Sequence, residues 1–238
     1  YEKIYMGRFE LLEKAFHRFV PDQAYETFVE KNKKWLEDYS LYMAIKNSLG
    51  GIAWSEWEAP LKTRQEAALE EKRVELKEQM DFICFQQYEF AKQWEKLKQY
   101  ANEKGIQIIG DIPIYVAFDS ADAWANPELF QFDENSTPLA VAGCPPDAFA
   151  ATGQLWGNPL YRWDYHAQTG YVWWISRLRH CFTLYDVVRV DHFRGFDEYY
   201  AIPYGDKTAE NGVWKKGPGI DLFHTVKKEL GDVNIIAE

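Results

Sequence analysis

The chain has 238 residues, 47% of them hydrophobic and 17% aromatic, which is enough apolar material for a globular core and excludes a disordered protein. Its formal net charge is −10, and because no dense basic stretch offsets the acidic excess, we expect no nucleic-acid binding. No apolar run approaches the roughly 18–20 residues of a membrane-spanning helix, so we expect no membrane association.

The first hundred residues read as a mostly helical subdomain, residues 1–100. Apolar side chains recur at helical spacing over residues 7–20, and Pro21 ends that helix. Asp22 is placed to cap a second helix. Ser40 is placed to cap a third helix, which the two glycines after Leu49 end.

A long charged helix is expected to follow, from Pro60 to about Met80, with a solvated face of i,i+4 ion pairs. Residues 82–100 continue the helical pattern. Their aromatic and apolar side chains, Phe90 and Leu97 among them, are expected to point at a core.

After residue 105 the pattern alternates between strand, loop and helix, which predicts an α/β architecture. Three buried strands are expected, each with an acid where its apolar run ends: Asp111, Asp191 and Glu238. Helices over residues 175–185 and 221–230 lead into the second and third strands. Residues 117–173 read as one long loop rich in aromatic residues, and loops of this length inside a compact domain are usually functional.

Charged residues gather at the end of the second strand. Residues two apart on a strand share a face, so Arg189 and Asp191 project the same way, and His192 and Arg194 follow. Such a cluster is either a structural ion-pair network or a site where an aspartate is kept ionised for chemistry, and these residues alone leave both interpretations open. Acids at the carboxyl ends of parallel strands are typical of (β/α)8-barrel active sites.

Three motifs in this chain together resemble one family. They are RVDHFRGF at residues 189–196, GDIPIYV at residues 110–116 and GQLWGNPLY at residues 153–161. In this combination they are similar to the 4-α-glucanotransferases, also called amylomaltases or disproportionating enzymes, which are relatives of the α-amylases.

The resemblance implies a fold and an extent. It implies that residues 101–238 are part of a catalytic (β/α)8 (TIM) barrel, about strands 3 to 5, with the helical subdomain inserted on its N-terminal side. Since only three strands are expected, the chain looks like an internal fragment of a larger enzyme. The family's third carboxylate would lie beyond residue 238, so the fragment alone is expected to be inactive.

The resemblance also implies the site residues. Retaining glycoside chemistry uses one carboxylate as nucleophile and a second as acid/base. By resemblance Asp191 is the nucleophile, Glu238 is the acid/base, and Arg189 orients the nucleophile. The implied substrate-binding residues are His192, which contacts the sugar, Asp111, which lines the site, and three residues of the loop that folds over the donor glucan: Asp147, Gln154 and Trp156.

Four of the five substrate-binding residues have a plainer interpretation that stays open. Asp111 precedes a proline by two positions and could cap a turn, and His192 could be a hydrogen-bonded core histidine. Trp156 could anchor its own loop. Asp147, after two prolines, could be a turn residue.

The implied activity is transfer of α-1,4-glucan segments to the 4-hydroxyl of glucose or of another glucan by a retaining double displacement. The implied partners are α-1,4-glucans and maltooligosaccharides, with glucose as an acceptor, and no metal or organic cofactor is expected. Two alternatives remain: an α-glucoside hydrolase of the same clan, and a non-catalytic glucan-binding module. Cys84, Cys144 and Cys181 form neither a disulfide framework nor a zinc pattern, so a cytoplasmic location is expected.

Overall fold

The computed structural model describes residues 2–238, with side chains from residue 7 onward. The chain forms two compact units, Tyr1–Lys96 and Leu97–Glu238. Within the described residues, no helix is both long enough and apolar enough to cross a membrane.

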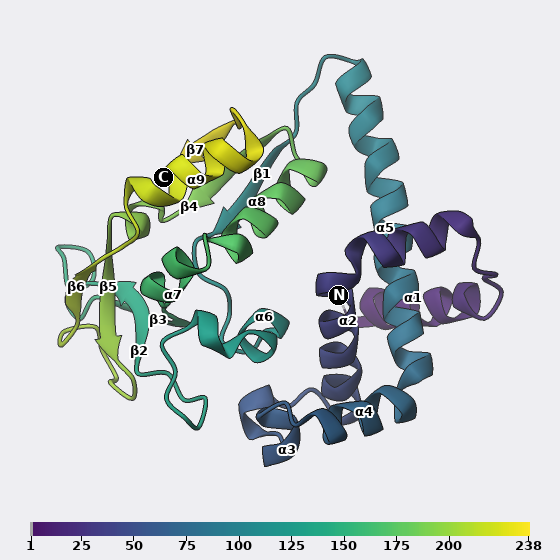
Figure 1. Cartoon of the computed structure of the whole chain (residues 1–238), viewed down its shortest axis with the longest axis horizontal. Helices are drawn as coiled ribbons and strands as arrows, with labels where there is room; N and C mark the ends of the chain where they lie inside the picture. The colour runs from purple at the N-terminus through teal and green to yellow at the C-terminus, as the bar shows by residue number, and fades with distance from the viewer. Residues whose placement is uncertain (1) are drawn as a thin grey trace. The chain divides into compact units, whose positions relative to one another are not determined.

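The first unit is helical (Figure 1). Its elements are α1 (Glu2–Phe16), α2 (Gln23–Ser48), η1 (Trp54–Glu56), α3 (Ala59–Lys62), α4 (Glu66–Glu75) and the first part of α5 (Lys77–Glu103). Asp22 caps α2 as expected, since its side chain accepts a hydrogen bond from the Tyr25 backbone N–H at 2.9 Å.

Ser40 does not begin a helix, so that prediction is wrong. It is buried in the middle of α2, and its hydroxyl donates to the Glu37 carbonyl at 3.1 Å. Serine can bond back to the preceding turn in this way without ending the helix. The apolar residues on both sides of it therefore belong to one continuous face.

The prediction of a single charged helix from Pro60 to Met80 is also wrong, because this stretch contains α3, α4 and the start of α5. The chain turns between α3 and α4, where Arg64 has a positive φ of 53°. The charged face is present, since Arg73 pairs with Glu66 at 2.6 Å and with Glu70 at 3.2 Å.

The core expected at the C-terminal half of α5 is misplaced. Phe85, also in the predicted set, is buried as expected, together with Ile83 and Tyr88, but Phe90 and Leu97 are more than half exposed. A helix of 27 residues need not face one core along its whole length, and the apolar period alone does not tell which turns are covered.

The second unit contains a small parallel sheet. Its strands are β1 (Ile109–Pro113), β4 (Val187–Asp191) and β7 (Ile235–Ala237), in the order β1-β4-β7. Helices α8 (Val172–Leu184) and α9 (Ile220–Leu230) lead into β4 and β7. The central strand is the buried one, with Val188 and Val190 at 0% and 1% exposure. The expected α/β architecture, the three parallel strands and these two helices are confirmed, but the expected burial of all three strands is wrong, because most residues of β1 and β7 are exposed.

The segment 117–173 differs from the one long loop that was expected. It contains α6 (Ala121–Ala125), η2 (Pro127–Leu129), β2 (Ala140–Cys144), β3 (Gln154–Pro159) and α7 (Trp163–Gln168). Strands β2 and β3 join β5 (Glu198–Pro203) and β6 (Val213–Lys216) in an antiparallel sheet of order β3-β2-β5-β6. Several of its aromatic residues are structural, because Trp124, Phe130, Tyr161 and Trp163 are buried.

The carboxyl ends of the parallel strands point toward this antiparallel sheet (Figure 1). A short helix, η3 (Phe193–Phe196), connects β4 to β5. The chain after β6 returns to it, since the Gly217 N–H donates to the Asp197 carbonyl at 2.7 Å and the Gly219 N–H to the Phe196 carbonyl at 2.8 Å. A Cβ on Gly217 would lie 2.3 Å from the Phe196 carbonyl oxygen, so this close approach requires glycine. The backbone that follows Asp191 is therefore held from both sides.

Candidate active site

The register of the parallel sheet gathers three carboxylates around one arginine. Asp111 on β1 lies opposite Arg189 on β4, and Asp191 lies on the same face of β4 as Arg189. The Arg189 Nη1 atom lies 2.6 Å from Asp111 Oδ1, and Nη2 lies 3.2 Å from Asp191 Oδ1. Nη2 also contacts Glu238 Oε2, from the end of the third strand. The residues expected at the three strand ends therefore meet at one point.

The shared arginine limits the distance between the two candidate catalytic carboxylates. Asp191 and Glu238 contact the same nitrogen atom of Arg189, so their nearest oxygens lie within about 6 Å of each other. A retaining mechanism needs a separation of about 5–5.5 Å, whereas an inverting one needs about 6.5–9.5 Å to admit a water molecule. The shared arginine therefore places the two carboxylates side by side, as a pair of glycosidase carboxylates requires.

The surroundings of Glu238 differ from those that a catalytic general acid requires. Its side chain is 59% exposed, and its carbonyl accepts a hydrogen bond from the Phe193 N–H at 2.5 Å. A general acid is held protonated by a dry or like-charged environment. Asp191 supplies the like charge, but residues 2–238 do not cover the Glu238 carboxyl group.

His192 lies beside this cluster in a strained backbone conformation. Its φ is +56°, in the left-handed region that non-glycine residues rarely adopt. Burial lowers the pKa of His192; the negative charge of Asp191 opposes this shift and the positive charge of Arg194 adds to it. Its Nε2 atom is buried and makes no hydrogen bond within the described residues. An orphaned ring nitrogen is not what a satisfied core histidine shows.

Two residues of the GQLWGNPLY motif reach the same place. Trp156 on β3 packs edge-on against the His192 ring with the ring centroids 4.8 Å apart. The Trp156 Nε1–H donates to Gln154 Oε1 at 3.0 Å. The Trp156 ring thus contacts the candidate site as well as its own strand, and Gln154 orients it.

Asp147 is not part of this group. Its Oδ1 atom accepts hydrogen bonds from the backbone N–H groups of Phe149 at 2.8 Å and Ala150 at 2.7 Å. These bonds shape a turn between β2 and β3, at the tip of which Phe149 is 99% exposed. In the structure Asp147 acts as the turn residue of the plainer interpretation.

Tyr115 belongs to the site but was not among the expected residues. It follows β1, and its ring lies 6.3 Å from the His192 ring and 6.4 Å from the Trp156 ring. Its hydroxyl is buried without a hydrogen-bond partner within the described residues, and burial raises the pKa of Tyr115. The signal that could have found it was its place in the GDIPIYV motif, four residues after Asp111.

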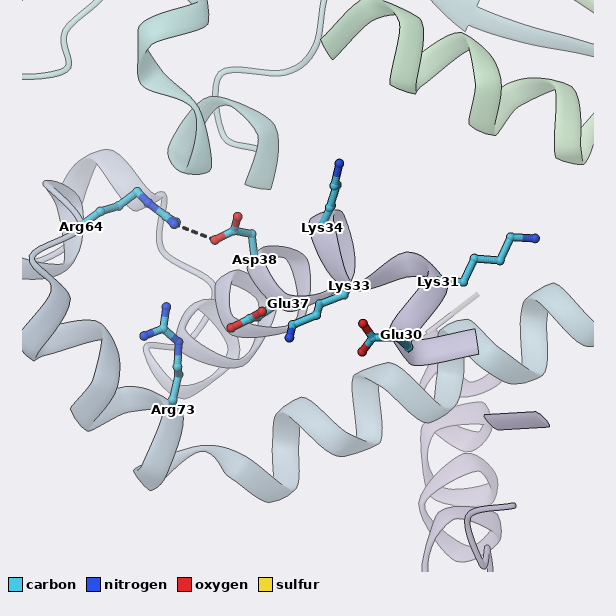
Figure 2. A pocket seen from close by; sticks show the side chains of 8 residues that line it. All are labelled: Glu30, Lys31, Lys33, Lys34, Glu37, Asp38, Arg64 and Arg73. Carbon is cyan, nitrogen blue, oxygen red and sulfur yellow. Dashed lines mark hydrogen bonds and ion pairs between the residues drawn. The ribbon is translucent and has the colours of Figure 1, made fainter. Parts of the chain in front are cut away.

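A cavity of about 540 Å³ lies elsewhere, on the surface of the first unit (Figure 2). Opposite charges pair inside it, and Arg64 reaches Asp38 at 2.6 Å. None of the expected site residues lines it; the lining residues are Glu30, Lys31, Lys33, Lys34, Glu37, Asp38, Arg64 and Arg73. In the described part of the chain, no group of three or more histidine, cysteine, aspartate or glutamate side chains is arranged to hold a metal ion.

Known proteins resemble this chain along its whole length. The profile of glycoside hydrolase family 77, described as 4-alpha-glucanotransferase, matches residues 1–238. The 4-alpha-glucanotransferase of Streptococcus pneumoniae serotype 4 is 52% identical over 242 residues, covering 100% of this chain and 48% of that protein. The Clostridium butyricum 4-alpha-glucanotransferase is 48% identical over 241 residues, covering 100% of this chain and 50% of that protein.

A solved structure agrees with these sequence relatives. The amylomaltase from Streptococcus agalactiae in complex with acarbose superposes with a TM-score of 0.95 at 44% identity, covering 100% of this chain and 49% of that chain. The chain therefore spans about half the length of the curated relatives it matches.

Proposed function

Because the chain belongs to the 4-alpha-glucanotransferase family, we propose that the whole protein transfers segments of α-1,4-glucan to the 4-hydroxyl of glucose or of another glucan. The observation that carries this proposal is the contact of Asp191 and Glu238 with the same Arg189 nitrogen at the ends of two parallel strands. Two neighbouring carboxylates can serve as the nucleophile and the acid/base of a retaining double displacement.

In the first half-reaction the Asp191 carboxylate attacks the anomeric carbon of the donor glucan. The new carbon–oxygen bond forms as the glycosidic bond breaks, and the leaving oxygen takes the proton of Glu238. Arg189 holds the Asp191 carboxylate in the orientation for attack on the anomeric carbon while the carboxylate becomes the glycosyl ester. In the second half, the 4-hydroxyl of the acceptor attacks the same carbon, Asp191 leaves, and Glu238 takes the proton of that hydroxyl.

The residues around His192 are proposed to bind the sugar at the reacting bond. The buried, unpartnered Nε2 of His192 can bond a sugar hydroxyl, which would satisfy it. Trp156, held by Gln154, offers an aromatic wall, and Asp111 lines the opposite side of Arg189. Asp147 would act only through its turn. The acarbose bound to the Streptococcus agalactiae amylomaltase supports a maltooligosaccharide ligand.

We further propose that β1, β4 and β7 are consecutive strands of a (β/α)8 barrel. The helices that lead into β4 and β7, together with the parallel order β1-β4-β7, support this proposal. Each edge strand carries an exposed apolar residue, Ile109 on β1 and Ile236 on β7, which further strands would cover. The described residues alone do not enclose the candidate site, so we expect the isolated chain to be inactive.

Exposure of the carboxylates gives the hydrolase alternative a specific basis. Asp191 and Glu238 have side chains 54% and 59% exposed, so water reaches both in the part of the chain described. Transfer requires that substrate or further parts of the protein exclude this water. Product analysis separates the two reactions, because hydrolysis of maltotriose yields no longer oligosaccharides.

The experiment is a maltotriose disproportionation assay on the full-length protein. We expect glucose together with maltooligosaccharides longer than maltotriose. Asp191→Asn should remove both, whereas Asp232→Asn, at an exposed loop aspartate that pairs with Lys227 at 3.0 Å, should leave them unchanged. Glucose and maltose without longer products would indicate a hydrolase, and no turnover in the wild type would indicate a binding module.

We also infer a cytoplasmic location. Support comes from the cysteines Cys84, Cys144 and Cys181, all of which are free thiols. Free thiols persist in a reducing compartment.

A further inference from the structure

A second cluster of aromatic and cationic side chains lies just beyond the candidate site. Arg194 is in η3, three residues after Asp191, and its guanidinium carbon lies 4.1 Å from the centroid of the Trp214 ring. Trp214 is on β6, the edge strand of the antiparallel sheet. Tyr200, opposite it on β5, packs against it with the ring centroids 5.2 Å apart.

The hydrogen-bonding capacity of Arg194 is unused. Within residues 2–238 its guanidinium makes no hydrogen bond, and the carboxylate it pairs with, Glu198, is 3.7 Å away. The other Glu198 oxygen pairs with Lys216 at 2.8 Å. The Arg194 side chain is 59% exposed and Trp214 is 39% exposed, so donors and ring surface are both open to a ligand.

The stack is not needed to hold η3 in place. The Gly217 and Gly219 N–H groups already donate to the backbone on the C-terminal side of η3, and the Phe193 N–H donates to the Glu238 carbonyl. Phe193 and Phe196 pack on Phe223 of α9 with ring centroids 5.0 and 5.3 Å away. These contacts fix the short helix from inside, and Arg194 projects from its outer side.

Arg194 is close to the candidate site, because it follows His192 by two residues. Its positive charge acts on His192, beside the carboxylate cluster, and also on Cys144, at the end of β2. Burial raises the pKa of Cys144; Asp147 adds to this rise and Arg194 opposes it. The charge of Arg194 therefore acts both on His192, next to Asp191, and on Cys144 at the end of β2.

We propose that Trp214 and Arg194 form an additional glucan-binding subsite, which holds a glucose unit of the chain away from the reacting bond. The apolar C–H face of that pyranose packs against the part of the Trp214 ring that Arg194 leaves open. Two neighbouring hydroxyls of the same unit accept hydrogen bonds from the forked N–H groups of Arg194. This inference rests on the proposed function, because it takes the α-1,4-glucan as the ligand.

The test measures binding without turnover. Isothermal titration of maltoheptaose is carried out on the full-length protein in an Asp191→Asn background. Trp214→Ala should weaken the Kd by about five- to ten-fold, the range that loss of one aromatic contact corresponds to. Trp214→Phe, which keeps a ring, should lose less, and Arg194→Lys, which keeps the charge but loses the fork, should also weaken binding. The matched control is Lys215→Ala, an exposed neighbour on the same strand, which should leave the Kd unchanged.

Three results would overturn the subsite. The first is a Kd for Trp214→Ala within two-fold of the unsubstituted protein. The second is an equal loss in Trp214→Phe and Trp214→Ala accompanied by a lowered melting temperature, which would make the ring structural. The third is binding of inorganic phosphate that depends on Arg194, while maltoheptaose binding does not. If maltoheptaose binds as predicted but the wild type does not disproportionate maltotriose, the subsite stands and the proposed transfer reaction fails.

Discussion

His166 makes folding stability depend on pH in a way that can be calculated. The residue is fully buried in α7, with Nε2 3.2 Å from the Leu129 carbonyl oxygen and Nδ1 without a hydrogen bond within the described residues. Burial lowers the pKa of His166 from 6.5 to about 4. The unfolded chain therefore binds this proton more tightly than the folded protein does, and acid favours unfolding.

The sign and size of the effect follow from these two pKa values. The contribution of neutral His166 is fully present above about pH 6.5 and is lost as pH falls toward about 4. A difference of about 2.5 pH units corresponds to about 3 kcal/mol, of which most is lost by about pH 4.5. Carboxylates and other histidines also titrate in this range. We therefore predict the difference in unfolding free energy between the wild type and a variant that lacks His166.

The comparison protein is His166→Gln. Its amide N–H can still donate to the Leu129 carbonyl, but it does not titrate. Urea unfolding of both full-length proteins, followed by tryptophan fluorescence between pH 7.5 and 4.5, should give curves that diverge by about 2–3 kcal/mol at the acid end, with the wild type losing more. Parallel curves would refute the reasoning, because they would mean that His166 is protonated equally in the folded and unfolded states.

Two further changes test the contacts that position the site. Gly217→Ala should lower the melting temperature strongly, since its Cβ would lie 2.3 Å from the Phe196 carbonyl oxygen, whereas Gly7→Ala, in a helix with nothing within 4 Å, should stabilise by about 0.5–1 kcal/mol; similar melts for both variants would contradict this. Asp186→Asn should cost about 1–2 kcal/mol at pH 7, because an amide oxygen can replace the acceptor of the Ile108 N–H, 2.8 Å from Asp186, but without the negative charge that strengthens this bond and pairs with Lys98 at 3.5 Å. The hydrogen bond from the Ile108 N–H is the largest cause that lowers the pKa of Asp186 in the folded protein. The stabilisation is therefore lost as pH falls through this lowered pKa. Chemical denaturation should therefore find the two proteins converging in acid, and a pH-independent gap would argue against this origin.

The strand-end cluster was predictable because its causes are local. Side chains alternate along a strand, so Arg189 and Asp191 had to share a face, and the structure confirms that they are in contact. Parallel strands bring their carboxyl ends to one edge, so acids at three strand ends were expected to meet, and Asp111 and Glu238 both reach Arg189. The roles of these residues in catalysis remain predictions.

The antiparallel sheet was not predictable by the same means. Ala140 on β2 pairs with Pro203 on β5, a partner more than sixty residues away that no local pattern indicates. Strand β2 is five residues long and β6 is four, so the two-residue period had little length in which to appear. The stack of Arg194 on Trp214 depends on the register of β6 against β5, which the four residues of β6 did not reveal in the sequence.

A double displacement requires a covalent bond between Asp191 and the glycosyl group of the donor. The measurement is peptide mapping by mass spectrometry of the full-length protein, quenched in acid after reaction with a slow-turnover fluorinated α-glucosyl fluoride. The account predicts one added glycosyl group, carried by the peptide that contains Asp191 and absent in Asp191→Asn. A glycosyl group on any other residue, or unlabelled protein that still converts maltotriose, would contradict it.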